Sequence, residues 1–394
     1  MLNGEILKRI ENHPYEKEIL ELNDYMARNP EISGKEYQSS RRIVEILRKY
    51  GIEVEYPYGG LETAFCGRIY GKKQQGPKIC ILTEYDALCG IGHGCGHCAS
   101  GSISVLAALI IKELRDVFCG EVHIVGTPDE EISGGKIKMA QAGLFDSYDY
   151  AIMMHMNQVN TVNCRMLAME DVIIEFFGKS AHSSASPWEG RNAFNAAQLF
   201  FHALDMMRQH VRPEVRIHGI LRHAGDAPNI VPEYVKCEAY IRANTVRYAK
   251  ELYSWMEDCA KGAALATKTT YKMWRLSPPL RELSENPTAE NALQRIYKKY
   301  GLEPEPVQEP MGSSDIGEVD DRIPAFHPLI QVQKDLVLHT KEMAEAMTQP
   351  SGHEAIRNGG RILAEFIVET LMDSELLYQI KEDYSKFTEK YRND

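Results

Sequence analysis

The pattern of apolar positions predicts helices at the start of the chain and buried strands after them. In the first fifty residues, apolar side chains recur at helical spacing in two stripes, at 19–26 and 43–47. Short apolar runs then follow at 78–86, 121–131 and 150–155, separated by helical patterns, which is typical of strands buried in a parallel sheet. The chain therefore begins as an α/β domain.

A different pattern begins near residue 170. Strand-like runs and helical stretches follow one another in the order βαββαβ, with the helices over 191–211 and 246–264. This order is the split ferredoxin-like arrangement. We therefore expect a separate inserted domain at 170–284.

The α/β pattern returns after this module, with a strand near 325–333 and an amphipathic helix over 351–373. The first domain is then discontinuous and consists of 1–169 and 285–394. A last stretch, from residue 374 on, has apolar residues at helical spacing and predicts an amphipathic surface helix. The expected fold class is α/β, a mixed and mostly parallel sheet flanked by helices, with an inserted ferredoxin-like βαββαβ domain.

Length and charge limit the classes of function. A chain of 394 residues is long enough for two domains, and its net charge of −11 repels nucleic acid and anionic lipid. No apolar run approaches the length of about 20 residues that a membrane span needs, and the first residues lack the apolar core of a signal peptide. We expect a cytoplasmic protein that binds neither nucleic acid nor a membrane. Its nine cysteines, an odd number scattered along the chain, are expected to be reduced.

Three successive predicted strands end in residues that can bind metals. Glu84 and Asp86 follow the first strand, the acids of 129–131 follow the second, and His155 ends the third. In α/β sheets, ligands collect beyond the carboxyl ends of the strands. The pattern predicts one shared site.

The densest cluster of candidate ligands is EYDALCGIGHGCGHC, at 84–98. Cys95 and His97, two residues apart among glycines, can reach one metal ion of the zinc type. Two alternatives stay open. Cys95 and Cys98 form a CxxC pair, as in thioredoxin-like dithiol enzymes, or these side chains merely fill a glycine-rich turn.

The adjacent acids of GTPDEE, at 126–131, form a second candidate constellation. Side chains of neighbouring residues point in different directions, so one acid can bind a metal while the other acts as a general base. His155 and His339 are further candidate ligands, but single histidines carry little information by themselves.

The chain resembles the dinuclear metallopeptidase family of aminoacylases, carboxypeptidase G and indole-acetyl-amino-acid hydrolases. It is most similar to the amidohydrolase branch that includes p-aminobenzoyl-glutamate hydrolase. The similarity covers about residues 15–373, and its motifs occur in the family's order: EYDALCGIGHGCGH, GTPDEEISGGKIKMAQAGLFD, MMH, GKSAHSSASPWEGRNAFNA, APNIVPEYV, GSSDIGEV, PAFHP and LHT. It implies a zinc-peptidase-like catalytic domain.

The resemblance also implies roles for individual residues. It implies that two divalent ions, zinc or manganese with cobalt as a further option, are bound in each subunit. The implied metal ligands are Cys95, His97, Glu131, His155 and His339. Glu130 is implied to be the general base, and Asp86 the acid that orients the metal site.

Residues of the inserted domain are implied to approach the substrate. His182 would stabilise the oxyanion, Asn229 would contact the substrate, and Arg242 would hold its carboxylate. The segment from Gly312 to Asp315 matches a loop that lines the same cleft, and Gly312 and Ser313 are implied to bind the substrate. In relatives, some of these groups act across a dimer interface, so we expect a homodimer or a higher homo-oligomer formed through the inserted domain.

The expected function is metal-dependent hydrolysis of an amide bond in an N-acyl amino acid or a dipeptide-like substrate. A thioredoxin-like oxidoreductase and a catalytically silent binding subunit are the alternatives. Two residues depart from the family pattern. Cys98 replaces the usual Asn or Asp after CGH, and Cys89 replaces a usual Pro. Neither change removes an expected ligand.

Overall fold

The computed structural model describes residues 2–306 and 312–391. One compact unit contains the chain up to Arg165 and most of the chain from Leu283 on, and the other contains Met166–Glu282. Gly312 and Ser313, which fall within the predicted segment 285–394, group instead with the inserted unit.

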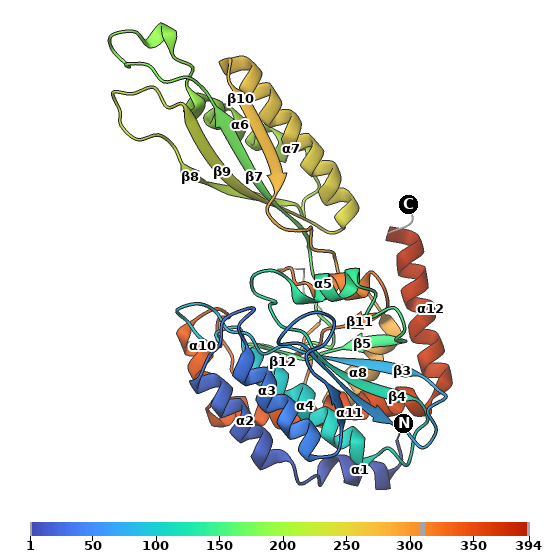
Figure 1. The fold of residues 1–394 in the computed structure, drawn as a ribbon. Coiled ribbons are helices and arrows are strands. Elements are labelled where there is room, and N and C mark those ends of the chain that lie inside the picture. The colour runs from blue at the N-terminus through green and yellow to red at the C-terminus, as the bar shows by residue number, and fades with distance from the viewer. Residues whose placement is uncertain (1, 307–311, 392–394) are drawn as a thin grey trace. The chain divides into compact units, whose positions relative to one another are not determined.

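A six-stranded sheet forms the centre of the first unit (Figure 1), in the order β1-β2-β4-β3-β5-β11. The strands β3, β4, β5 and β11 run parallel, whereas β1 and β2 are antiparallel to their neighbours. The bounds are β1 Glu53–Glu55, β2 Phe65–Tyr70, β3 Lys78–Thr83, β4 Glu121–Gly126, β5 Tyr150–Ile152 and β11 Ala325–Phe326. The predicted mixed and mostly parallel sheet is confirmed.

Helices flank this sheet. Helix α4 is buried over its whole length except for its last two residues, and it packs against α2 and α11. A Cβ atom on Gly359 of α11 would lie only 2.6 Å from Ile103 Cδ1 of α4, so this glycine lets the two helices approach closely. The helices of this unit are α1 Gly4–Glu11, α2 Glu16–Arg28, α3 Tyr37–Lys49, α4 His97–Glu113, α5 Gly135–Gln141, α8 Pro287–Lys299, α9 Ile316–Asp320, α10 Lys341–Ala346, α11 Pro350–Met372 and α12 Ser374–Tyr391.

Two predicted strands are each interrupted. The segment predicted as one strand at 150–155 forms β5 and the start of a second strand, β6 (His155–Asn157). The strand predicted near 325–333 is likewise divided into β11 and β12 (Leu329–Gln331). Between β11 and β12 lies Pro328, which has no backbone N–H to donate to a sheet. The strands β6 and β12 form a separate two-stranded parallel sheet, so His155 begins a strand and does not end one.

The inserted unit has the predicted βαββαβ order. Its four strands form an antiparallel sheet in the order β10-β7-β9-β8, which is the ferredoxin-like order, and α6 and α7 pack on one face. The bounds are β7 Ala168–Phe177, α6 Ala193–Met207, β8 Arg216–His223, β9 Tyr234–Ala243, α7 Val246–Thr267 and β10 Thr270–Arg275. The predicted fold class is therefore confirmed in both units.

The C-terminal helix α12 packs on α8 and α11, with Leu377 and Ile380 buried. Its amphipathic pattern is the one that the sequence predicts. Within the part of the chain that the structure describes, the helices are too short or too polar to cross a membrane.

Candidate metal centre

The carboxyl ends of β3 and β4 deliver acidic side chains to one edge of the sheet. Glu84 and Asp86 follow β3, and Glu130 and Glu131 follow β4. Because the two strands are parallel neighbours, their ends lie side by side. This is the convergence that the strand pattern predicts.

The glycine-rich turn before α4 brings two further candidates to this edge. Gly96 has a φ of +88° and directly precedes His97, the first residue of α4. A Cβ atom on Gly94 would lie 2.9 Å from the Thr340 carbonyl oxygen. The backbone N–H of His339 donates to the Gly94 oxygen at 2.8 Å, so the turn can hold the segment of His339 close.

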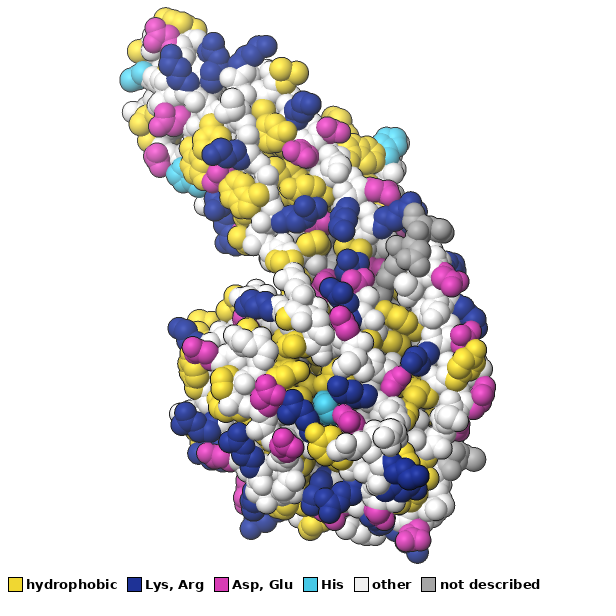
Figure 2. Space-filling view, turned by 45° about the vertical axis from the view of Figure 1, so that its right-hand side comes forward, with side chains coloured by type: hydrophobic (Ala, Val, Ile, Leu, Met, Phe, Trp, Pro, Cys, Tyr) yellow, Lys and Arg dark blue, Asp and Glu magenta, His cyan; other side chains and the backbone are white. Residues whose placement is uncertain are grey.

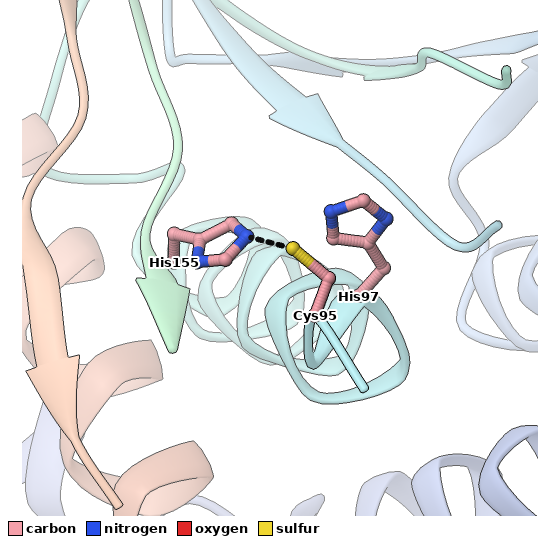
Figure 3. A group of neighbouring side chains, drawn as sticks. All are labelled: Cys95, His97 and His155. Atoms are coloured by element: carbon pink, nitrogen blue, oxygen red, sulfur yellow. Dashed lines mark hydrogen bonds between the residues drawn. The ribbon is translucent and has the colours of Figure 1, made fainter. Parts of the chain in front are cut away.

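The five predicted metal ligands fall into overlapping groups in which the ligand atoms lie within 4.8 Å of one another. These groups are Cys95 with His97 and His155, Cys95 with Glu131 and His339, and His97 with Glu130 and Glu131. Figure 3 shows the first group, in which Cys95 Sγ lies 3.4 Å from His155 Nε2. Cys95, His97 and Glu131 each belong to two of these groups, so the groups form one continuous cluster.

The carboxylate of Asp86 orients two of these side chains. Its Oδ1 lies 2.8 Å from His97 Nδ1, and its Oδ2 accepts the backbone N–H of Glu131 at 3.0 Å and the Ser33 hydroxyl at 2.7 Å. Burial opposes ionisation of Asp86, but the neighbouring His97 holds the pKa of this carboxyl below its usual range. A carboxylate bonded to the outer nitrogen of a histidine ligand is the usual support of a metal site.

Both central histidines present the same nitrogen to the site. His155 Nδ1 lies 2.8 Å from the Met156 carbonyl oxygen, and His97 Nδ1 is held by Asp86. Each ring therefore keeps Nε2 as its available ligand atom. Burial, and then the charge of His97, lower the pKa of His155 to about 4, so this ring stays neutral as a ligand must.

The donor set fits a divalent metal ion. Burial raises the pKa of the Cys95 thiol to about 12, so its thiolate needs a neighbouring cation. Glu131 Oε1 is buried and has no hydrogen-bond partner among the described residues. Sulfur, imidazole and carboxylate ligands together suit zinc or a similar ion.

A second group of acids adjoins the site. The carboxylate oxygens of Glu84, Glu130 and Asp315 lie within 4.8 Å of one another. Burial, and then the charges of Glu84 and Asp315, raise the pKa of Glu130 to about 8. Burial opposes ionisation of Glu84 as well, but Lys136 and His97 lower its pKa to about 2.

Sequence reasoning overlooks Lys136 here and assigns no role of its own to Ser314. Lys136 is completely buried against Glu84 and Asp315, and Ser314 donates to Glu130 Oε1 at 2.8 Å. The sequence does offer one indication of Lys136. This lysine lies at the start of a helix and its neighbours in sequence are glycine and apolar residues. Ser314 lies in the GSSD loop, where only Gly312 and Ser313 are singled out.

Two other members of the cluster at 84–98 do not join the ligand groups. His93 is buried, and its Nδ1 accepts the backbone N–H of Cys98 at 3.2 Å. Cys98 is fully buried in α4. Both side chains belong to the packing around the turn.

The inserted unit places His182 and Asn229 next to each other. His182 pairs with Ile230, and the backbone N–H of Ser183 donates to the Asn229 carbonyl oxygen at 3.0 Å. His182 Nδ1 accepts backbone N–H groups of Ser184 and Ala185, both at 3.3 Å. A neutral His182 then carries its proton on Nε2 and can donate a hydrogen bond from there.

Arg242 and Ser313 form a second pair in the same unit. The Arg242 guanidinium donates to Ser313 Oγ at 2.9 Å, and Gly312 bridges to Met166. Asn229 precedes the first residue of β9, whereas Arg242 lies at the other end of that strand. At about 3.3 Å per residue, the strand from Tyr234 to Arg242 alone spans about 26 Å. The structure does not bring the two pairs together within one chain.

Comparison with known proteins identifies the family of the chain. The model of peptidase family M20/M25/M40 matches residues 84–369. The Xaa-Arg dipeptidase of Mus musculus is 32% identical over 340 residues, which cover 83% of this chain and 79% of that protein. One of the subunits of the p-aminobenzoyl-glutamate hydrolase of Escherichia coli strain K12 is 30% identical over 294 residues, which cover 69% of this chain and 60% of that protein.

A solved structure shares the fold. The crystal structure of a dinuclear metal binding peptidase of the M20 family from Bacillus subtilis matches with a TM-score of 0.68 at 20% identity. The match covers 90% of this chain and 99% of that one. The predicted resemblance is confirmed, and the chain belongs to peptidase family M20/M25/M40.

Proposed function

We propose that the protein is a metal-dependent amidohydrolase that cleaves an N-acyl amino acid or a dipeptide-like substrate and releases a free amino acid. The observation that carries the proposal is the cluster of overlapping ligand groups, in which Glu130 lies with His97 and Glu131. Relatives are named as a dipeptidase, a p-aminobenzoyl-glutamate hydrolase and an N-acetyl-L-cysteine deacetylase. The substrates that these protein names contain all have an amide bond between an acyl group and an amino acid.

We propose that each subunit binds two divalent ions, zinc or manganese, with cobalt as a further option. The residues that would hold them are Cys95, His97, Glu131, His155 and His339. Bound there, such ions polarise a carbonyl group and lower the pKa of an attacking water.

Glu130 is positioned to move the proton. Its carboxylate belongs to the ligand group of His97 and Glu131, and Ser314 holds its Oε1. In the proposed reaction, Glu130 takes a proton from the attacking water and returns it to the leaving amine. Asp86 keeps His97 and the backbone of Glu131 in place meanwhile.

The inserted unit supplies groups for the rest of the substrate. Arg242 is half-buried, and its hydrogen bond to Ser313 is to a neutral hydroxyl, so its charge is available for the substrate carboxylate. The Nε2–H of His182 is available for the oxyanion. Ser313, which binds Arg242, and Ser314, which binds Glu130, are consecutive residues.

The structure weakens the dithiol alternative. Cys95 and Cys98 are both buried, and burial raises the pKa of each thiol to about 12. A reactive CxxC pair needs an accessible thiol with a lowered pKa. Nothing in this arrangement favours disulfide exchange.

We also propose that the protein is a homodimer or a higher homo-oligomer formed through the inserted unit. Strand β8 is an unpaired edge of the sheet and exposes two apolar side chains, and α6 and α7 expose others. Figure 2 shows hydrophobic side chains at the surface of this unit. The exposed residues on these elements include Ile220, Leu221, Leu199, Met206, Trp255 and Leu265. The open edge of β8 and these exposed side chains support pairing with a second copy of the chain.

The separation of the two pairs supports this assembly. One small substrate cannot contact both His182 and Arg242 of the same chain when β9 lies between them. A second subunit that supplies His182 and Asn229 removes the difficulty. We therefore assign His182 to a site whose metals and base belong to the partner chain.

The substrate class is tested by mass spectrometry on the purified protein loaded with zinc, manganese or cobalt. Dipeptides ending in arginine, p-aminobenzoyl-glutamate and N-acetyl amino acids are the compounds to screen. We expect release of a free amino acid from at least one class, loss of the activity in a chelator, and recovery when the ion is returned. Turnover that persists after the metal has been removed would contradict the proposal.

The role of Glu130 is tested by Glu130→Gln, which keeps the shape of the side chain but not its basicity. We expect kcat to fall by about 10² to 10⁴, while bound metal and substrate affinity remain. Elemental analysis and isothermal titration with substrate check the two retained properties. If metal is lost together with activity, Glu130 is a ligand and not the base.

The partner's contribution is tested by mixing two inactive proteins, Glu130→Gln and His182→Ala. Reassembled hybrid dimers contain one site with both groups intact, so activity should recover to a sizeable fraction of the wild-type value. Mixing Glu130→Gln with itself is the control. Absence of recovery, although mass spectrometry shows that the subunits have exchanged, would place His182 in the site of its own chain or outside any site.

A further inference from the structure

A completely buried lysine lies beside the proposed base. Lys136 has an exposed fraction of 0%, and its Nζ is 2.5 Å from Glu84 Oε1 and 2.5 Å from Asp315 Oδ1. Its backbone N–H also donates to Asp315 Oδ2, at 3.0 Å. Lys136 therefore binds both oxygens of one carboxylate and one oxygen of another.

The ammonium group of Lys136 lies against a cluster of three acidic side chains. Glu84, Glu130 and Asp315 bring their oxygens within 4.8 Å of one another, and Glu84 and Asp315 are almost completely buried. Buried carboxylates at such distances repel one another unless a positive charge lies among them. Lys136 supplies such a charge through its contacts with Glu84 and Asp315.

Asp315 connects this cluster to the base. Ser314, its neighbour in sequence, donates from Oγ to Glu130 Oε1 at 2.8 Å, and helix α9 begins directly after Asp315. The two bonds from Lys136 to Asp315 fix the start of α9, and with it the hydroxyl of Ser314. Loss of the lysine would free this segment next to Glu130.

We propose that Lys136 is a positioning residue for Glu130, acting through Asp315 and Ser314. This inference rests on the proposed function, because it assigns Lys136 to the alignment of that same base. Lys136 donates no proton in the reaction and binds no metal. It holds the hydroxyl that orients the carboxylate.

Lys136→Met tests the proposal, because methionine keeps most of the length of the side chain but removes its charge. We expect kcat to fall by about 10- to 100-fold, with KM and bound metal close to wild type. Hydrogen exchange followed by mass spectrometry should show faster exchange in 314–320 and unchanged exchange in α11. Lys138→Met is the matched control, since Lys138 lies on the same helix but is half-exposed and pairs with Asp129.

A second variant separates positioning from charge balance. Removing one partner of a buried ion pair destabilises a protein, whereas neutralising both partners often does not. Lys136→Met/Asp315→Asn should therefore recover much of the thermal stability that Lys136→Met loses, while kcat stays low and exchange in 314–320 stays fast. Recovery of kcat together with stability would overturn the proposal, because Lys136 would then only balance charge.

Hydrogen exchange keeps this inference testable without a substrate. If the wild-type protein has no amidohydrolase activity, the proposed function fails, whereas unchanged exchange in 314–320 of Lys136→Met would refute the positioning role by itself. An active wild type whose Lys136→Met variant has a normal kcat would also refute it.

Discussion

The site depends on the carboxylate of Asp86. Three segments that are distant in the sequence meet at this one group, because it accepts hydrogen bonds from Ser33 and from the backbone of Glu131 and holds the ring of His97. His97 is the first residue of α4, whereas Glu131 follows β4. Their common partner Asp86 therefore fixes the distance between them. A buried carboxylate with these partners is stable only when each of its bonds is made. The positions of His97 and of the Glu131 backbone follow from it.

Much of this could be predicted because the informative residues sit at the ends of regular elements. Apolar runs that stop at Glu84 or Glu130 indicate both a strand and a side chain beyond it, and parallel neighbours put such ends together. The run that stops at His155 leads to the same edge, although His155 begins β6 and does not end a strand. The βαββαβ order of the inserted unit follows in the same way from alternating periods of hydrophobicity. Motif resemblance adds His339, which the strand pattern by itself could not connect to residues some 180 to 250 positions earlier.

The remaining features depend on contacts that local sequence does not encode. Lys136 contacts Asp315, which lies 179 positions later in the sequence. The break between β11 and β12 near Pro328 gives His155 a different strand partner, because β6 pairs with β12 in a separate sheet. The separation of His182 from Arg242 becomes visible only when both are placed along β9. The proposal that a second subunit takes part in the chemistry rests on that separation.

The account rests on a proposed metal centre that includes Cys95, and metal content tests it most directly. Protein loaded with zinc or manganese is passed through a gel-filtration column and analysed by elemental analysis, with Cys95→Ala beside the control Cys98→Ala. The account predicts about two ions per chain in the wild type and in Cys98→Ala, and less than about one in Cys95→Ala. Equal metal content in Cys95→Ala and the wild type, or a wild type that retains no metal, would contradict it.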